Sequence, residues 1–521
     1  MRSPAGRHQV PFADVLTDAA SPAGLPRPEH VEPVALATLV PAQASVDQPA
    51  VLVTGITATS GQVRPGDLFA ALPGTHTHGA RFAAAALSAG AAAVLTDAAG
   101  RALVPAGVPV LEVADVRSAL GPIASRVYGD PSTALRVLAV TGTSGKTTTT
   151  FFLRAALAAA GRTAGLIGTV ATYVGHDELK TGFTTPEAPD VHALLAVMRE
   201  RGVTDVAMEV SSHALELGRV GGVAFDVAGF TNLSQDHLDF HPDMEAYFRA
   251  KARLFEAGAT PVIVVDDEWG RRLRAELGAD VATVSTLARA DTTWWVSDVV
   301  ERAEGATQFV AHARDIAIAA STVIPGRFNV TNALLAIAML DAVGIDAGVA
   351  AAAIATATVP GRMERVDAGQ AFLAVVDYSH KPAAVDGALR ALRPLTRGRL
   401  VVVLGCGGDR DHAKRPVMGE IAARGSDVLV VTDDNPRSED PAVIRGEMLA
   451  GALAVPASER GEVLEVGDRA QAIAVAVGSA RAGDTVLVAG KGHETGQEVA
   501  GVVHPFDDRS VLRAALEAAR P

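Results

Sequence analysis

Cysteine is nearly absent from this sequence, since Cys406 is the single one among 521 residues. One thiol excludes an internal disulfide and any metal site built from several thiolates. Long apolar runs are also absent: Ser88 and Gly90 interrupt the Ala-rich stretch 83–94, and none approaches the roughly 18 residues of a membrane-spanning helix. Residues 1–30 contain Pro and Asp where a signal peptide has an apolar segment. We therefore expect a cytoplasmic protein without membrane insertion.

Positive charge is in short supply. The 46 Lys and Arg residues face 59 Asp and Glu residues, for a net charge of −13, which argues against a nucleic-acid partner. Lysine is rarer still, with six residues: Lys146, Lys180, Lys251, Lys381, Lys414 and Lys491. A lysine kept in an arginine-rich chain suggests a need for a compact ammonium or a reactive amine. Chance is the alternative explanation at any single position.

The remaining composition is that of a globular protein, with 49% hydrophobic and 20% charged residues. Its length predicts two to four domains. Short apolar runs alternate with helical patterns, which predicts three α/β domains: a small N-terminal domain (1–134), a central domain with a parallel sheet (135–359) and a Rossmann-like C-terminal domain (360–521). The expected buried strands are 51–53, 91–96, 108–113, 135–140, 164–167, 206–210, 227–230, 262–265, 374–376, 400–404, 428–431 and 485–488.

A glycine-rich loop lies between the strand expected at 135–140 and the helix expected at 149–160. It reads Thr-Gly-Thr-Ser-Gly-Lys-Thr-Thr from Thr141 to Thr148. Backbone N–H groups of such a loop cradle phosphates, Lys146 reaches the β- and γ-phosphates, and the Thr147 hydroxyl ligates Mg²⁺. Val140 stands where the general phosphate-loop pattern has glycine. A plain glycine turn before a helix is the alternative.

Polar residues follow two of the expected strands. Glu209 ends one strand, at the edge where α/β sheets bind ligands, and beside a phosphate loop a Mg²⁺ ligand is the favoured role. His237 lies in a polar cluster after another strand and is a candidate contact to metal or phosphate. Lys251 falls on a helical pattern, where an ordinary solvated lysine remains the alternative.

Taken together, the motifs resemble the Mur ligase superfamily. They are the phosphate loop, TTPE from Thr184, EVSSH from Glu209, NLSQDHLD from Asn232, GRFNVTN from Gly326, GRME from Gly361, VDYSHKP from Val376, GGDR from Gly407, DNPR from Asp434 and GKGHE from Gly490. The resemblance covers the chain from about residue 50 onward. Within that superfamily, the motifs resemble most the branch that adds meso-diaminopimelate to a UDP-linked muramyl dipeptide.

That resemblance implies an ATP-dependent amide ligase of peptidoglycan precursor synthesis, with ATP and Mg²⁺ as co-substrate and cofactor. It implies catalytic roles for Lys146, Glu209, His237 and Lys251, with Lys251 carbamylated, and metal contacts from Thr147, Glu209, His237 and Lys251. The implied ATP site comprises Gly142, Thr143, Ser144, Gly145, Lys146, Thr147, Thr148, Asn329, Asn332, Arg362 and Asp377. The implied muramyl-dipeptide site comprises Ser60, Thr75, His76, Thr77, Thr184, Thr185, Ser211 and Arg219.

The amino-acid pocket implied by the resemblance comprises Arg410, Asp434, Asn435, Pro436, Arg437, Gly490 and Glu494. Diaminopimelate carries a second carboxylate that lysine lacks, and an arginine can bind a carboxylate through two N–H groups. Arg437 and Arg410 supply such charge, while Glu494 suits the distal ammonium. An Asn-Pro turn without a binding role is the alternative for DNPR.

Some positions depart from the family pattern. Relatives carry Asp-Ser-Arg where this chain has Thr59-Ser60-Gly61, which leaves the uridine contacts open. Three other interpretations also stay open: a lysine-adding relative, a folylpolyglutamate synthase, and a non-catalytic scaffold controlled by nucleotide. All substrates are expected to be small molecules, and a monomer is the expected state.

Overall fold

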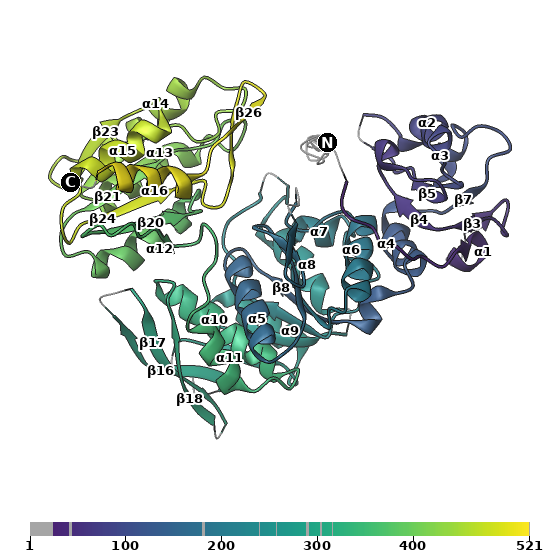
Figure 1. Ribbon diagram of the computed structural model, residues 1–521, viewed down its shortest axis with the longest axis horizontal. Helices are drawn as coiled ribbons and strands as arrows, with labels where there is room; N and C mark the ends of the chain where they lie inside the picture. The colour runs from purple at the N-terminus through teal and green to yellow at the C-terminus, as the bar shows by residue number, and fades with distance from the viewer. Residues whose placement is uncertain are drawn as a thin grey trace, which may run out of the picture.

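The structure is a computed structural model that describes residues 24–40, 44–74, 76–179, 183–238, 240–256, 258–287, 291–302, 305–314 and 316–519. Three sheets, each with helices packed on it, form three lobes that follow one another along the chain (Figure 1). The expected fold class, three α/β domains built on largely parallel sheets, is confirmed.

The N-terminal lobe is built on a five-stranded sheet of order β2-β7-β6-β5-β4, in which β2 alone runs antiparallel to its neighbour. β1 and β3 pair separately. The strands are β1 (Val34–Ala35), β2 (Ser45–Val46), β3 (Leu52–Val53), β4 (Gly55–Thr57), β5 (Asp67–Ala70), β6 (Ala93–Thr96) and β7 (Val110–Glu112). The helices are α1 (Leu36–Leu39), α2 (Ala83–Ser88), α3 (Ala98–Arg101) and α4 (Val116–Val127).

The central lobe holds an eleven-stranded sheet of order β11-β10-β9-β12-β8-β13-β14-β15-β16-β17-β18. The strands are β8 (Arg136–Thr141), β9 (Ala164–Ile167), β10 (Thr172–Val174), β11 (Asp177–Leu179), β12 (Asp205–Glu209), β13 (Val227–Phe230), β14 (Thr260–Val264), β15 (Ala282–Ser285), β16 (Trp294–Glu301), β17 (Thr307–Ala313) and β18 (Ile316–Thr322). The helices are α5 (Lys146–Ala159), α6 (Ala188–Glu200), α7 (Ser212–Glu216), α8 (Met244–Ala252), α9 (Glu268–Leu277), α10 (Arg327–Asp341) and α11 (Ala347–Ile354).

The middle of this sheet is parallel, as expected, but both of its edges are not. Strands β10 and β11 form an antiparallel extension at one edge, and β17 and β18 form another beyond β16. These hairpins were not predicted from the sequence. Parallel strands need helical crossovers, whereas antiparallel hairpins need only short turns, so the sheet can grow at its edges without further helices.

The C-terminal lobe holds a six-stranded sheet of order β19-β20-β24-β21-β22-β23, parallel except for β19. The strands, including a separate hairpin of the last two, are β19 (Glu364–Arg365), β20 (Leu373–Asp377), β21 (Leu400–Leu404), β22 (Val428–Val431), β23 (Glu462–Glu465), β24 (Thr485–Ala489), β25 (Gly496–Val499) and β26 (Val502–Pro505). The helices are α12 (Pro382–Leu392), α13 (Lys414–Gly425), α14 (Pro441–Ala454), α15 (Arg469–Ser479) and α16 (Asp508–Ala518).

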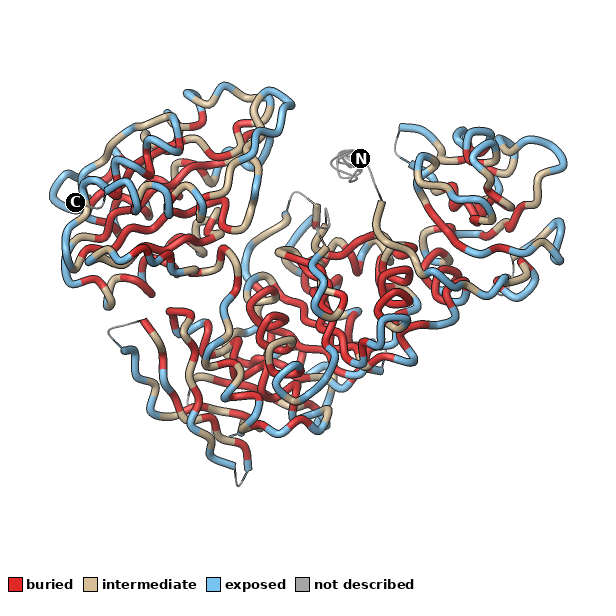
Figure 2. The backbone as a smooth tube through the Cα atoms, in the orientation of Figure 1, coloured by how far each residue is buried: buried red, intermediate tan, exposed pale blue. Residues whose placement is uncertain are grey.

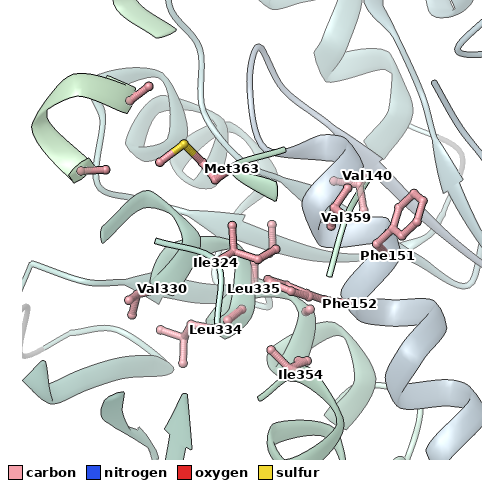
Figure 3. Packing of buried hydrophobic residues seen from close by; sticks show 14 of the residues in the cluster. Val140, Phe151, Phe152, Ile324, Val330, Leu334, Leu335, Ile354, Val359 and Met363 are labelled. Carbon is pink, nitrogen blue, oxygen red and sulfur yellow. The ribbon is translucent and has the colours of Figure 1, made fainter. Parts of the chain in front are cut away.

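Buried residues concentrate on the strands and on the helix faces turned toward them (Figure 2). In the central core, Phe152 of α5 belongs to the same buried cluster as Leu335 of α10 and Ile354 of α11 (Figure 3). Each buried aromatic or aliphatic side chain contributes roughly 1.5–3 kcal/mol. Because α5 is anchored along its length, the position of Lys146 and Thr147 at its first turn is well determined. Within the described ranges, no helix has the length and apolarity needed to cross a membrane.

Candidate active site

The phosphate loop connects β8 to α5, as expected. Gly142 has φ +142°, and a Cβ atom there would lie 1.8 Å from the Thr231 hydroxyl. Gly145 has φ +90°, and its Cβ would lie 2.3 Å from Oδ1 of Asn332. Both positions therefore require glycine, for conformation as well as for space. The loop curls over the first turn of α5, where free N–H groups attract anions.

Lys146 is held at this loop. Its Nζ donates to the carbonyl oxygens of Gly142 (2.8 Å) and Thr143 (3.1 Å). Burial lowers the pKa of Lys146 to about 8, while the nearby carboxylate of Glu209 acts in the opposite direction. An incoming phosphate would restore full charge on the ammonium, because an anion favours the protonated form.

Glu209 connects the phosphate loop to the neighbouring strand. Its side chain is fully buried at the end of β12. One carboxylate oxygen accepts from the Thr147 hydroxyl (2.9 Å) and from the Thr169 hydroxyl (3.0 Å), and the other accepts from Thr169 N (2.8 Å). A hydroxyl and a carboxylate this close provide the oxygen ligands that Mg²⁺ prefers. The Thr147–Glu209 pair thus fits the predicted cofactor.

The predicted contacts to the muramyl dipeptide adjoin this carboxylate. The Thr169 and Thr184 hydroxyl oxygens lie 3.0 Å apart, and the Thr185 hydroxyl donates to the Glu209 carbonyl (2.9 Å). Ser211 accepts from Ala214 N (3.1 Å) and so caps α7. The structure therefore joins Thr185 directly, and Thr184 through Thr169, to Glu209.

Arg219 lies at the far end of the same group. Its Nε donates to Glu187 (2.9 Å) and its Nη1 to the Thr185 carbonyl (3.2 Å). Glu187 also accepts from Arg117 of α4 (2.9 Å). Nη2 of Arg219 is buried and has no hydrogen-bond partner among the described residues. A buried guanidinium N–H with no acceptor is costly, so this nitrogen is available to donate to a bound substrate.

Lys251 is not a solvated helix lysine. It is 1% exposed on α8, its Nζ donates to the Gly142 carbonyl (2.8 Å), and it lies 4.6 Å from the ring centroid of Tyr247. Burial lowers its pKa well below the ordinary value. A neutral primary amine is the form that reacts with carbon dioxide, so this environment suits the predicted carbamate.

His237 occupies a turn with φ +52°, 3.3 Å from Asp236 and with its ring 4.8 Å from that of His213. Burial lowers the pKa of His237 to about 3, against the effect of Asp236. Over the described part of the chain, no three His, Cys, Asp or Glu side chains cluster as a ready-made metal site. Of the predicted metal ligands, Thr147 and Glu209 are joined directly, while Lys251 reaches the phosphate loop through Gly142.

Residues from α10 and the start of the C-terminal lobe complete the nucleotide side. Asn332 donates to Asn329 (3.0 Å), both on the buried face of α10. The Arg362 guanidinium stacks 4.4 Å above the ring centroid of Tyr378 and lies 3.5 Å from the Thr147 hydroxyl. Asp377 accepts from Met363 N (2.7 Å), so here it holds the chain segment that carries Arg362.

The two predicted parts of the amino-acid pocket meet. Asn435 donates to Glu494 (2.9 Å), and Lys491 donates to both Asn435 (2.9 Å) and Glu494 (3.2 Å). Gly490 has φ +119°, and a Cβ there would lie 2.5 Å from an oxygen of Asp434. The DNPR turn and the GKGHE loop therefore form one polar unit.

The two predicted arginines differ. Arg437 donates to the Gly408 carbonyl (2.6 Å) and lies 3.4 Å from Glu498. It is the last residue of the DNPR turn, directly after Pro436, and has φ +52°. Arg410 lies at the end of the same 407–410 loop, and its side chain is exposed. Only Arg437 is in place beside the pocket, and Arg410 would have to turn inward to contribute.

The predicted uridine residues are the least organised group. Ser60 begins a short 3-10 turn, His76 and Thr77 are exposed, and Thr75 lies outside the described residues. An arginine that the sequence analysis overlooked lies nearby: Arg27 donates to the buried carboxylate of Asp67 (2.7 Å) and to the Gln62 carbonyl (3.2 Å).

Two further residues were missed as site residues. Thr169 belongs to no quoted motif, so no local signal marked it. Lys491 stands inside GKGHE and is fully buried among polar groups. Its rarity as a lysine was a usable signal, because a chain that otherwise prefers arginine kept it at this position.

Comparison with known proteins shows the family. Three family models match in order: the Mur ligase family, catalytic domain (residues 52–128), the Mur ligase middle domain (140–340) and the Mur ligase, glutamate ligase domain (361–492).

Among curated relatives, the UDP-N-acetylmuramoyl-L-alanyl-D-glutamate–2,6-diaminopimelate ligase of Streptomyces avermitilis is 53% identical over 95% of this chain and 98% of the relative. The ligase of the same name from Streptomyces coelicolor is 52% identical over the same shares. A solved structure titled with that ligase name superimposes with a TM-score of 0.67 at 32% identity, covering 94% of this chain and 99% of the other. The chain belongs to the Mur ligase family.

Proposed function

We propose that this protein joins meso-diaminopimelate to the D-glutamate γ-carboxylate of UDP-MurNAc-L-Ala-D-Glu, using ATP, as a step in peptidoglycan precursor synthesis. Two relatives at 52–53% identity over nearly their whole length carry the name of this activity. The structural observation that carries the proposal is the chain of contacts from Thr147 through Glu209 and Thr169 to Thr184, which joins the phosphate loop to the predicted dipeptide site.

In the first step, an oxygen of the D-glutamate γ-carboxylate attacks the γ-phosphorus of ATP, and ADP leaves. Lys146 and the N–H groups at the first turn of α5 offset negative charge on the transferred phosphoryl group. In the second step, an amine nitrogen of diaminopimelate attacks the acyl carbon, phosphate leaves with the bonding electron pair, and the nitrogen loses a proton. The products are an amide, ADP and phosphate.

Mg²⁺ supplies charge neutralisation at the phosphates when it is bound. We assign Thr147 and Glu209 as its oxygen ligands, with His237 and a carbamylated Lys251 as further members of the site. Thr184, Thr185, Ser211 and Arg219 are assigned to the muramyl dipeptide, with Ser60, Thr75, His76 and Thr77 at its uridine end. Three substrates must meet in one place, so positioning contributes as much as charge.

We assign recognition of diaminopimelate to the DNPR turn and the GKGHE loop. Asn435 and Glu494 suit the distal ammonium, and Arg437 suits the distal carboxylate, with Arg410 turning inward. The proposal includes domain limits at 134/135 and 359/360, a monomeric state and a cytoplasmic location, where ATP and the nucleotide-linked substrate occur together.

The decisive experiment incubates the purified protein with ATP, Mg²⁺ and UDP-MurNAc-L-Ala-D-Glu, and offers diaminopimelate or L-lysine in parallel. Phosphate release with a diaminopimelate-sized gain in product mass, and no reaction with lysine, supports the proposal. Equal use of lysine overturns the assigned specificity but keeps the ligase. Absence of turnover with either amine favours a nucleotide-controlled scaffold instead.

A further inference from the structure

An ion pair joins the C-terminal lobe to the nucleotide site. The Lys381 ammonium contacts the Asp236 carboxylate, 145 residues away in the chain. Lys381 directly precedes α12 in the C-terminal lobe, whereas Asp236 lies in the loop after β13 of the central lobe. The Asp236 side chain is 10% exposed and that of Lys381 is 32% exposed, so water screens this pair less than a surface pair.

The loop that carries Asp236 also holds the phosphate loop. We call residues 231–237 the clamp loop. Thr231 donates to the Ser144 carbonyl (2.7 Å), and Asn232 exchanges two hydrogen bonds of 3.1 Å with the backbone of Ser144. Ser234 N donates to the Thr143 hydroxyl (3.0 Å). The clamp loop thus binds two successive residues of the phosphate loop, and a shift of one would be passed to the other.

Asp236 is itself fixed within the clamp loop. Its Oδ1 accepts from His237 N (2.9 Å), and Oδ2 is the atom that meets Lys381. Because of this hydrogen bond, a displacement of the carboxylate also displaces the loop backbone. Lys381 of the C-terminal lobe therefore contacts the clamp loop of the central lobe directly, through this ion pair.

A second contact between the lobes lies at the start of the C-terminal lobe. Gly361 has φ +66°, and a Cβ there would lie 2.1 Å from His493 N of the same lobe, so the chain passes close to the GKGHE loop at this point. The adjacent Arg362 approaches the Thr147 hydroxyl. Apolar packing also joins the two lobes, since one buried cluster contains Val330 of α10 and Leu389 of α12. The Lys381 contact, 19 residues after Arg362, adds an ionic contact that reaches the clamp loop.

We propose that Lys381 is a positioning residue which, through Asp236 and the clamp loop, couples the seating of the C-terminal lobe to the phosphate loop. This inference rests on the proposed function. The amine is bound by the C-terminal lobe, whereas the acyl phosphate forms on the central lobe. By holding the C-terminal lobe in place, Lys381 keeps the amine positioned to attack the acyl carbon for the lifetime of the acyl phosphate.

Loss of the coupling has a specific chemical consequence. When the C-terminal lobe is not docked against the clamp loop, water replaces the amine as the nucleophile. Water adds to the acyl phosphate, phosphate leaves, and the original carboxylate returns with release of a proton. ATP is then consumed without amide formation. The ratio of phosphate released to amide formed therefore reports the coupling, and a merely structural defect that lowers total activity would leave this ratio unchanged.

The test compares Lys381→Met with Lys381→Arg, which keeps the cation, and with Arg390→Met. Arg390 is an exposed residue of α12 that pairs only with Asp386 of the same helix among its described contacts, and it serves as the control. We expect Lys381→Met to lower amide formation about tenfold and to raise the phosphate-to-amide ratio well above one. Lys381→Arg and Arg390→Met should keep the ratio near one.

A ratio of one and an unchanged rate in a folded Lys381→Met variant would overturn the proposal. If that variant unfolds, Asp236→Asn provides the same comparison, and adding Lys381→Met to it should cause little further change. Hydrogen exchange of peptides spanning 231–237 gives a readout that needs no turnover, and Lys381→Met should exchange faster there. If the wild-type chain forms no amide with any amine, the proposed function fails, while faster exchange would still support the coupling and unchanged exchange would refute it.

Discussion

The Thr147 hydroxyl donates to the Glu209 carboxylate across 2.9 Å, and this bond joins the start of α5 to the end of β12. Glu209 is fully buried, and such donors offset the cost of burying a carboxylate. Thr169 supplies two more, one from its backbone and one from its hydroxyl. The carboxylate is therefore held in place before any phosphate or metal arrives.

Replacement of Glu209 by Gln should abolish turnover while keeping the fold. The amide oxygen still accepts hydrogen bonds, but the negative charge for Mg²⁺ is lost, so we expect phosphate release to fall by about 10²-fold or more. The check is coupled phosphate release together with the Tm. Glu216→Gln, which alters a surface residue paired with Arg253, is the matched control and should behave as wild type. Activity within a few-fold of wild type in Glu209→Gln would contradict the assignment.

Lys491→Met should weaken binding of the amine substrate selectively. Lys491 is buried and holds Asn435 and Glu494, so its loss frees both groups that face the predicted distal ammonium. We expect the KM for diaminopimelate to rise about tenfold or more, because hydrogen bonds to charged groups contribute roughly 1.5–3 kcal/mol. The KM for ATP should stay within about twofold. Separate titration of the three substrates checks this, and an equal rise in the KM for ATP would show a general defect instead.

Asp508→Ala should strongly destabilise the C-terminal lobe. Asp508 and Arg469 form an ion pair at 2.7 Å in which neither side chain is exposed. Removing one partner leaves a buried unpaired guanidinium, at a cost of about 3–5 kcal/mol. Urea unfolding of the full chain measures this change. Glu459→Ala removes one of the two exposed carboxylates that pair with Arg424 and should cost less than about 1 kcal/mol. Equal effects of the two substitutions would refute the argument.

The stability of the chain should fall in mild acid partly because of His192. This residue of α6 is fully buried, its Nε2 lies 2.9 Å from the Gly221 carbonyl, and burial lowers its pKa to about 4. In the unfolded chain its pKa is about 6.5, so the unfolded state binds more protons between pH 6.5 and pH 4. Stability is therefore complete above pH 6.5 and is lost as the pH falls, by about 3 kcal/mol at pH 4.

The check for His192 is the difference in Tm between wild type and His192→Gln at pH 8 and at pH 4.5. The advantage of wild type at pH 8 should shrink or reverse at pH 4.5, because glutamine does not titrate. Other buried histidines titrate in both proteins and so cancel in the difference. A difference that does not change with pH would show that His192 does not contribute to the acid sensitivity.

Much of the fold could be predicted because its buried parallel strands are short apolar runs. The strands β9, β13, β21 and β22 have the bounds expected from sequence. The antiparallel edges were missed, since β10 and β11 are three residues each and carry no clear pattern. For β17 a signal existed: alternate residues from Thr307 onward are buried, which is the period of a strand with one covered face.

The candidate site, like the fold, could be predicted only where a local sequence motif marks it. The phosphate loop is a local motif, so its sequence was sufficient to place it. The burial of Lys251 could not be predicted from its helix, because its partner Gly142 lies 109 residues away and only the tertiary fold brings them together. The role of Thr169 was hidden for the same reason, since nothing near it in the sequence resembles a site.

The scarcity of lysine has a practical side. Among the described lysines, Lys251 and Lys491 are buried, Lys146 and Lys381 lie at the nucleotide site, and Lys414 is half-buried, while Lys180 lies outside the described residues. Reagents that acylate primary amines, such as dye esters and coupling resins, would therefore find few lysines in the described part of the chain that lie away from the nucleotide site. Because Lys146 and Lys381 lie at the nucleotide site, slower labelling of their amines would indicate that nucleotide is bound. Since Cys406 is also buried, immobilisation of this ligase is best achieved through an introduced surface cysteine.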